Sequence, residues 1–351
     1  FREEGGEWTL VETGAFGRVR RGLDGGLYAA SGKKLMLVKP AGALRTVLEH
    51  APGPIHDFAV DKEGRAVVIG PFLEQDSVTW ERDGALAPRD DVGFYSAGGE
   101  RLALKLPEPH LFAWSVACDA SGAFWLGAKQ GLYSWGVPGF LRHAPPGEDL
   151  WMLGEKTDAM HAARDGSVAY ANDLGVTRYD PRTSSWIGMR TDTHGVPFPY
   201  ARAIAEEPGG ELWIGGEHGA ARRDLKGAWT YYQGEAWLPH DGVLAIAVAP
   251  DRRVLLGTES GLGVIVRRPV TLAKKAEHFD EIAQKHHVNR YGFVWSVGCR
   301  SPGDVSTAGE SGYTDNDGLW TASYIGSQCL RYAATKSAEA RKNAKRSMDG
   351  L

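Results

Sequence analysis

Cysteine is scarce in this sequence of 351 residues, and long apolar runs are missing. No run of 18 apolar residues occurs, which excludes a transmembrane helix. The three cysteines, Cys118, Cys299 and Cys329, contain no Cys-x-x-Cys pair and no metal-ligand spacing. We expect Cys118 to be a small core residue. Cys299 and Cys329 could form a disulfide or be two free thiols, so the cysteines do not indicate whether the protein works in an oxidising or a reducing compartment.

Positive charge is not in excess either. The formal net charge of −4 at pH 7 provides no basic field that would indicate a nucleic-acid partner. The sequence also lacks a Gly-x-x-x-x-Gly-Lys-Ser/Thr loop, a Rossmann glycine pattern and a Gly-x-Ser-x-Gly elbow, which excludes the enzyme classes built on them. Because the chain begins at Phe1 with no visible signal peptide, we expect a processed or partial chain.

Glycine, in contrast, is abundant and recurs at a fixed interval. Gly131, Gly175, Gly219 and Gly261 each follow a short apolar segment, such as Leu-Trp-Ile-Gly at 212–215, and they are 44, 44 and 42 residues apart. A period in the range of roughly 40–50 residues is typical of β-propeller blades.

Each copy also has a turn before the apolar segment and a second apolar run before the turn. This order predicts an inner strand next to a channel, a tight turn and a central strand. Two fainter copies, at 25–38 and 55–70, bring the total to about six blades, with five to seven open, and an insertion of about a dozen residues is expected near Asp83–Gly99. The predicted fold class is mainly β, a propeller over residues 1–268. A β-sandwich, the alternative, has turns every 8–12 residues or so but no such long period.

The segments after the recurring glycines add a more specific pattern. They include Gly-Leu-Tyr-Ser-Trp at 131–135 and Ala-Trp-Thr-Tyr-Tyr at 228–232. With Leu-Trp-Ile-Gly, and over residues 20–268, this pattern resembles the two-component-regulator propeller repeats. The resemblance implies a propeller fold and a ligand-sensing role in an extracellular or periplasmic protein.

The pattern changes at Pro269. Apolar residues at helical spacing predict helices at 271–287, 319–335 and 337–348, with a long loop at 300–318. The stretch around Asp315-Asn316-Asp317-Gly-Leu-Trp is similar to helical toroid domains that follow propeller repeats in multidomain proteins. We therefore expect residues 269–351 to be the N-terminal part of a larger α/α domain whose remainder is missing from this chain. At the other end, Glu7–Val11 predicts a strand that either completes another blade and closes the ring or follows an upstream segment.

The loop before the second helix contains four carboxylates, those of Asp304, Glu310, Asp315 and Asp317. Two of them would suit acid–base catalysis on a glycan. Oxygen atoms of Asp315, Asn316 and Asp317 would instead suit Ca²⁺, although the EF-hand pattern is not matched. A helix cap with no further role is the third alternative. Calcium is the one cofactor that the sequence suggests.

Two residues at the end of the first predicted helix and just beyond it suggest a second kind of chemistry. His287 as a base and Tyr291 as a proton donor would suit a polysaccharide lyase. Arg300 would bind the carboxylate of an anionic sugar. The alternative is a histidine pair, His286 and His287, that interacts with the helix dipole.

The residues that enter each inner strand of the propeller are expected to ring one mouth of the channel. Their aromatic, imidazole and guanidinium groups suit a sugar or a small anion, and an empty polar mouth is the alternative. These residues are His56, Asp57, Trp114, His161, Tyr200, Arg202 and Asp241. Trp125 and Trp213, within the repeats, are expected in the core.

These patterns favour a secreted or surface propeller protein that binds carbohydrate and processes it at the junction with the helical region. The expected localisation is extracellular, periplasmic or at the cell surface. The alternative is a non-enzymatic module that binds a ligand or assembles with another protein. The expected partner is a glycan, a small anionic ligand or another protein, and whether the protein is an enzyme stays open.

Overall fold

The computed structural model describes the chain except residues 1, 5–6, 10–16, 39–43, 51–53, 71–91, 104–110, 112, 129–130, 137–138, 148–151, 155–156, 192–193, 197, 302–303 and 313. The chain divides into two compact units, Phe1–Ile265 and Val266–Leu351. In the described residues of both units, no helix has the length and apolar character needed to cross a membrane.

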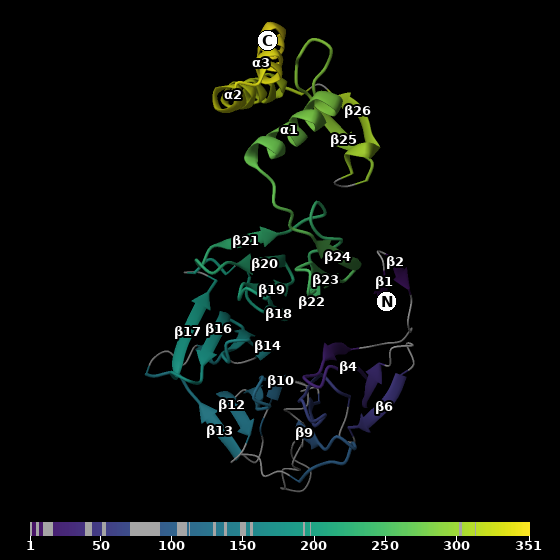
Figure 1. Ribbon diagram of the computed structural model, residues 1–351, viewed down its shortest axis with the longest axis vertical. Helices are drawn as coiled ribbons and strands as arrows, with labels where there is room; N and C mark the ends of the chain where they lie inside the picture. Colours follow the sequence, from purple (N-terminus) through teal and green to yellow (C-terminus); the bar gives the residue numbers. More distant parts are fainter. Residues whose placement is uncertain are drawn as a thin grey trace. The chain divides into compact units, whose positions relative to one another are not determined.

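The first unit is a six-bladed β-propeller, so the predicted fold class is confirmed (Figure 1). Each blade is an antiparallel sheet whose strands run in chain order from the channel outward. Blades 1 to 3 are β3 (Arg18–Arg21), β4 (Leu27–Ser31), β5 (Lys34–Val38), β6 (Leu44–Glu49); β7 (Asp57–Val60), β8 (Ala66–Ile69), β9 (Val92–Tyr95); and β10 (Ala113–Cys118), β11 (Phe124–Ala128), β12 (Gly131–Gly136), β13 (Gly139–His143). Blades 4 to 6 are β14 (Thr157–Ala162), β15 (Val168–Asn172), β16 (Gly175–Asp180), β17 (Ser185–Arg190); β18 (Ala203–Glu206), β19 (Leu212–Gly216), β20 (Gly219–Arg223), β21 (Trp229–Tyr232); and β22 (Val243–Val248), β23 (Val254–Thr258), β24 (Gly261–Ile265).

The same backbone hydrogen bond closes the turn after the inner strand of every blade. In blade 2 the N–H of Asp61 donates to the carbonyl oxygen of Arg65 at 3.0 Å. The equivalent donors in blades 1 and 3 to 6 are Gly22, Asp119, Ala163, Glu207 and Ala249. The turn residues in the sequence thus give a common register for all six inner strands.

The recurring glycine at the start of the third strand is required by its backbone. Gly219 has φ +98°, and a Cβ atom there would lie 2.4 Å from the carbonyl oxygen of Tyr232. Any larger residue would combine an unfavourable backbone conformation with a clash against the neighbouring strand. This explains why glycine marks the period.

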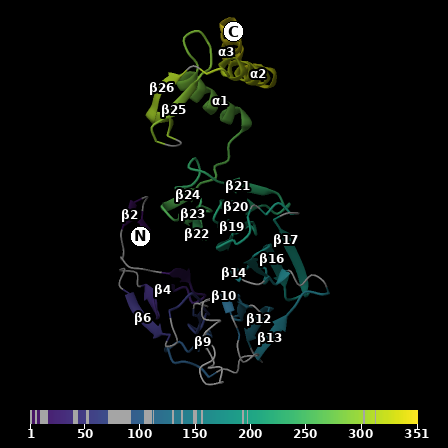
Figure 2. The same cartoon turned by 180° about the vertical axis from the view of Figure 1, so that it is seen from behind.

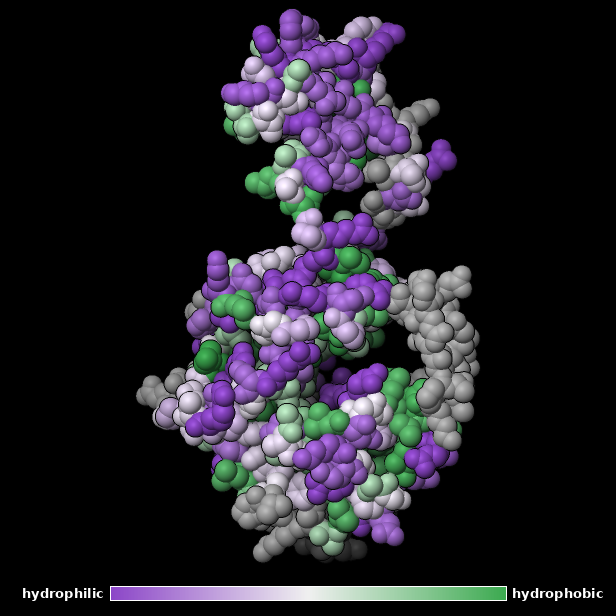
Figure 3. All heavy atoms as spheres, viewed as in Figure 1, coloured by the Kyte–Doolittle hydropathy of each residue, from purple (hydrophilic) through white to green (hydrophobic). Residues whose placement is uncertain are grey.

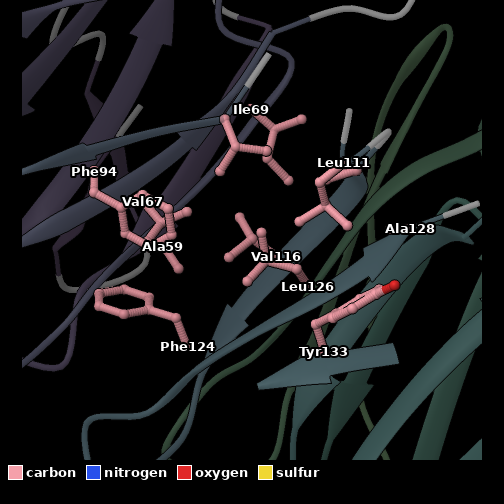
Figure 4. Close-up of a cluster of buried hydrophobic side chains, with 12 residues drawn as sticks. Ala59, Val67, Ile69, Phe94, Leu111, Val116, Phe124, Leu126, Ala128 and Tyr133 are labelled. Carbon is pink, nitrogen blue, oxygen red and sulfur yellow. The ribbon is translucent and has the colours of Figure 1, made fainter. Parts of the chain in front are cut away.

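Apolar side chains fill the spaces between consecutive blades. Five buried clusters join blades 1 and 2, 2 and 3, 3 and 4, 4 and 5, and 5 and 6. Figure 4 shows the one between blades 2 and 3, which includes Phe94 and Phe124. Trp125 and Trp213 are buried in two others, as expected, and their indole N–H groups donate to Asp119 and Glu207, each at 2.7 Å.

The N-terminal residues form a separate hairpin. Strands β1 (Arg2–Glu4) and β2 (Glu7–Thr9) pair with each other as a two-stranded antiparallel sheet. The strand expected at Glu7–Val11 is therefore present over Glu7–Thr9. Of the insertion expected near Asp83–Gly99, residues 83–91 lie outside the described part of the chain, and β9 follows them.

The second unit contains the three expected helices. Helix α1 (Leu272–Ile282) continues as a π-helical segment over Ala283–His287, and α2 (Asp317–Thr335) and α3 (Ala338–Gly350) pack together. The expected loop at 300–318 contains a strand, β26 (Ala308–Gly312), and a 3-10 turn at Val305–Thr307; β26 pairs with β25 (Ser296–Cys299), which directly precedes the loop. All three cysteines are free, so the disulfide alternative for Cys299 and Cys329 is wrong in this structure.

Candidate functional site

A cavity of about 440 Å³ lies in the propeller unit, and all six inner strands line it. A volume of this size suits a small-molecule ligand. Most of its wall is aliphatic. The ionisable side chains on the wall, apart from the thiol of Cys118, are those of Arg18, Arg20, Arg21, His161, Arg202 and Glu206.

Small side chains keep the centre of this cavity open. The position two residues before the turn is alanine in four blades, at 59, 117, 205 and 247, and these alanines line the cavity. The two exceptions are Arg20 in blade 1 and His161 in blade 4. Because the register is shared, these two side chains belong to the same level of the channel, where the other blades present only methyl groups.

A buried carboxylate holds the arginines of blade 1. Asp57 is fully buried, and its carboxylate lies 3.0 Å from Nη2 of Arg20 and 3.4 Å from Nε of Arg18. It also accepts a hydrogen bond from the N–H of Val116 at 3.0 Å, and Nη1 of Arg20 donates to the carbonyl oxygen of Val116 at 2.6 Å. Burial lowers the pKa of the Arg20 guanidinium, and the charge of Asp57 partly offsets this. Two guanidinium groups therefore share one carboxylate.

His161 and Glu206 form a second polar group on the wall. The Nε2 atom of His161 lies 3.9 Å from Oε2 of Glu206, beyond hydrogen-bond length, and Oε2 accepts from the N–H of Arg164 at 2.9 Å. Burial alone would raise the pKa of the Glu206 carboxyl. The imidazole of His161 and the Arg164 N–H outweigh burial, so that the pKa is lowered overall. Glu206 is consequently ionised at neutral pH. It faces the imidazole of His161 across the boundary between blades 4 and 5.

Arg202 directly precedes β18, and its guanidinium contacts two exposed carboxylates. It donates to Glu217 and lies 3.4 Å from Oε1 of Glu259. His240 lies 3.7 Å from the other oxygen of Glu259 and accepts a hydrogen bond from the N–H of Gly242 at 2.9 Å. This cluster is polar and solvent-accessible, so its net charge is well screened.

The expected ring of residues at the channel mouth is only partly assembled. Arg202 and His161 line the cavity, whereas His56 and Tyr200 are exposed and Trp114 is half-buried, outside its lining. Asp57 is buried in its ion pairs, and Asp241 accepts a hydrogen bond from the N–H of Gly234 at 2.7 Å. The roles of these residues in binding stay predictions.

The position of His161 differs from the expected one. It is the fifth residue of β14, so it lies toward the end of the strand and not at its start. A register shift between Thr157 and Ala159 adds a residue at the entry of β14, and the residue level with Arg202 is Asp158. The same shift occurs in β10 and β22, so the bulge does not account for the three residues between Asp158 and His161. The level of His161 follows from the turn at Ala163, which it precedes by two residues.

Sequence reasoning also missed the arginines of β3 and Glu206. The signal was present in the run Arg-Val-Arg-Arg at 18–21, which directly precedes the turn at Gly22. If the first, weakly matching repeat is aligned with the other repeats at its turn, Arg20 falls on the channel wall. Glu206 would have followed from the same alignment, one residue before the turn at Glu207.

The carboxylates expected to act in the second unit bind mainly to their own turns. Asp304 is exposed, and it accepts hydrogen bonds from the N–H and the hydroxyl of Ser306, which lower the pKa of its carboxyl. Asp317 is buried at the start of α2, and it accepts from the N–H and the hydroxyl of Thr314 at 3.0 and 2.7 Å. Asp315 and Asn316 are exposed, and the side chain of Glu310 lies outside the described part.

These positions bear directly on the calcium and catalytic hypotheses. Among the described residues, no group of three His, Cys, Asp or Glu side chains is arranged to hold a metal ion. His287 shares a hydrogen bond of 3.2 Å with the carbonyl oxygen of Trp295, and Tyr291 is exposed with the guanidinium of Arg290 over its ring. Arg300 is exposed as well. His287, Tyr291 and Arg300 thus each have separate local surroundings, and in the described part of the chain no hydrogen bond, ion pair or ring contact joins these three side chains.

A buried polar cluster in the second unit was not predicted. Asp280 of α1 accepts hydrogen bonds from Tyr324, Gln328 and Arg331 of α2 and from Asn343 of α3. Burial and the bond to Asp280 raise the pKa of the Tyr324 hydroxyl. Four donors on one buried carboxylate join the three helices, which is a structural role.

Comparison with known proteins supports the propeller fold but does not identify an activity. No family model matches the chain, and no curated protein is similar to it in sequence. Among solved structures, a streptogramin B lyase is 15% identical with a TM-score of 0.53, over 70% of this chain and 77% of that chain. Virginiamycin B lyase from Staphylococcus aureus is 11% identical with a TM-score of 0.53, over 71% of this chain and 80% of that chain.

A further similar structure is the extracellular domain of a one-component system from B. thetaiotaomicron. It is 13% identical with a TM-score of 0.47, and the match covers 70% of this chain but only 31% of that one. A similarity this weak supports no argument about function. The two lyases share a propeller fold with this chain, and at such low identity their activities are not transferred.

Proposed function

We propose that this protein is a ligand-binding propeller whose central cavity takes a small molecule with an anionic group, of which a sugar acid is the best-matched class. The observation that carries this proposal is the arrangement of Arg18, Arg20 and Asp57. Two guanidinium groups share one buried carboxylate, so this part of the wall retains positive charge. A carboxylate of a ligand would complete the pairing, because guanidinium groups bind carboxylates in two places.

The remainder of the cavity suits the neutral part of such a ligand. Alanines at the level of Arg20 leave room for a ring, and His161 offers a donor and acceptor on the opposite blade. The proposal includes an extracellular or periplasmic location, as the resemblance to sensing repeats implies. It does not include catalysis by Asp304, Asp315 or Asp317.

The proposal is tested by calorimetric titration and thermal melting with galacturonate and glucuronate, and with galactose and glucose as matched neutral sugars. A ligand that binds only the folded protein adds about 2.7 kcal/mol of stability at a hundred times its Kd. We expect an uronate to raise Tm while the neutral sugar of the same shape does not.

Two variants locate the site. Replacing His161 by glutamine, or Arg18 by glutamine, is expected to weaken uronate binding about tenfold, which is about 1.4 kcal/mol. Arg182→Gln, which changes an exposed arginine of the turn after β16, is the matched control and should leave affinity unchanged. Equal binding of neutral and acidic sugars, or equal affinity in all variants, would refute the proposal and favour a module that binds another protein.

A further inference from the structure

The wall of the propeller cavity carries charges of both signs. Guanidinium groups line much of it, those of Arg18, Arg20, Arg21 and Arg202. Among the described residues of the lining, Glu206 provides the single carboxylate. The proposed binding of a sugar acid uses only the positive charges, so the role of Glu206 is open. The space-filling view shows the propeller unit hollowed inside the ring of blades, with hydrophilic side chains on part of the border (Figure 3).

The carboxylate of Glu206 is buried and yet carries its charge at neutral pH. Its side chain is 5% exposed. Burial favours the neutral acid, but the imidazole of His161, the N–H of Arg164 and the charge of Arg178 outweigh it, and the pKa of the carboxyl lies below its usual value. A buried charge is costly unless a partner of opposite charge or a set of hydrogen bonds compensates it.

No arginine or lysine in the described part of the chain lies within ion-pair distance of Glu206. Nε2 of His161 lies 3.9 Å from Oε2 of Glu206, beyond hydrogen-bond length, and the N–H of Arg164 donates to the same oxygen. Arg178 acts only from a distance, because its guanidinium donates to side chains of the turn at 163–167. Among the described residues, Oε1 of Glu206 thus has no hydrogen-bond donor.

Three other buried carboxylates of the propeller do pair directly with an arginine. These pairs are Asp57 with Arg20, Asp61 with Arg65 and Glu207 with Arg222, at 3.0, 2.6 and 2.9 Å. Glu206 differs from them in that it belongs to the cavity wall. A ligand in the cavity can therefore supply the cation that the protein does not.

The positive and negative charges lie on opposite sides of the channel. The guanidinium of Arg20 reaches over the inner strands of blades 2 and 3, where it donates to the carbonyl oxygens of Phe58 and Val116 at 3.3 and 2.6 Å. Glu206 ends β18 of blade 5. Figures 1 and 2 show the blades in chain order around the channel, with blades 2 and 5 facing each other across it. Arg20 and Glu206 also lie at nearly the same level, two residues and one residue before their turns.

We propose that the cavity selects a zwitterionic ligand, an amino sugar acid whose carboxylate binds near Arg18 and Arg20 and whose ammonium group binds Glu206. This inference rests on the proposed function, because it assigns a second charged group to the ligand of the same cavity. An ammonium group has three donors, so it can bind the open Oε1 atom of Glu206 in a charge-assisted hydrogen bond. A sugar acid without an amine leaves that carboxylate without a cation.

The test compares three ligands that differ in one substituent. They are glucuronate, glucosaminuronate (in which an ammonium group replaces one hydroxyl) and N-acetylglucosaminuronate, titrated by calorimetry at a pH well below the pKa of the amine. We expect glucosaminuronate to bind at least tenfold more tightly than glucuronate. The N-acetyl form should lose this advantage, because its nitrogen carries no charge. The galacturonate series is measured alongside, and the comparison is made within the sugar that binds.

A variant then locates the ammonium group. Glu206→Gln keeps an acceptor for the N–H of Arg164 but removes the charge, so the preference for glucosaminuronate should fall below about twofold. Glu63→Gln is the matched control, since this exposed carboxylate of the turn in blade 2 lies outside the cavity lining, and it should keep the tenfold preference. Circular dichroism verifies that both variants fold, and the comparison of the three ligands in the unaltered protein does not depend on them.

The outcomes separate this inference from the proposed function. Equal affinity for glucuronate and glucosaminuronate would overturn the inference and leave the binding of sugar acids intact. Binding of the N-acetyl form as tight as that of glucosaminuronate would overturn it as well, because the added nitrogen would then act without its charge. So would a preference that persists in Glu206→Gln, since the ammonium group would then bind elsewhere. If none of the acidic sugars binds, the proposed function and the inference both fail.

Discussion

Replacing Asp57 by asparagine is expected to destabilise the propeller strongly. The substitution keeps an oxygen atom for the N–H of Val116 but removes the negative charge that Arg18 and Arg20 share. Removal of one partner from a buried ion pair leaves an uncompensated charge and costs about 3–5 kcal/mol. We expect a loss of this order in the free energy of unfolding, measured by urea denaturation with far-UV circular dichroism.

Two controls separate this effect from a general loss of charge. Glu217→Gln breaks an exposed pair with Arg202 and should cost less than about 1 kcal/mol. At 0.5 M NaCl the small effect of Glu217 should vanish, whereas that of the buried Asp57 should persist. The combination of Asp57→Asn with Arg20→Met should be more stable than Asp57→Asn alone, since it removes a stranded guanidinium. A loss below about 1 kcal/mol for Asp57→Asn, or no recovery in the double variant, would refute the reasoning.

Three further predictions follow from single residues. Gly219→Ala should cost at least about 1 kcal/mol more than Gly234→Ala, measured by thermal melting, because both have positive φ but only the first places a methyl group against the carbonyl oxygen of Tyr232. Burial lowers the pKa of His143, so the unfolded chain binds the proton first as pH falls below about 6.5; stability should therefore fall from pH 7.5 to 5.5, and His143→Gln should flatten that slope. Asp280→Asn should reduce hydrogen-exchange protection in all three helices of the second unit and leave the protection of the blades unchanged, and retention of full helix protection would contradict the role given to this carboxylate.

The propeller could be predicted from sequence because its period is imposed by backbone geometry. The recurring glycines at 131, 175, 219 and 261 all have positive φ, and at 175 and 219 a Cβ atom would also clash with the neighbouring strand. The turn before each central strand must close the same hydrogen bond. The buried positions of Trp125 and Trp213 followed from the same register. Local constraints of this kind can be recognised directly in the amino-acid sequence.

The candidate site was harder to predict because it depends on side chains that meet across blades. The pairing of Arg20 with Asp57 joins residues 37 positions apart, and the sequence around each residue contains no signal that predicts its partner. His161 was assigned to the wrong end of its strand because its distance from the turn at Ala163, which sets its level in the channel, was not counted. In the second unit, the hairpin β25–β26 was missed because the region is rich in glycine and serine, which predict loops.

The five apolar clusters of the propeller have a consequence for how it comes apart. Each cluster links only neighbouring blades, so the blades behave as a linear array in which every unit is supported by those next to it. Among the residues that the structure describes, an interior blade has two such supports and each terminal blade has one. Fraying should therefore begin at blades 1 and 6 and move inward, so that the slowest-exchanging amides of the array lie in blades 3 and 4, farthest from either end.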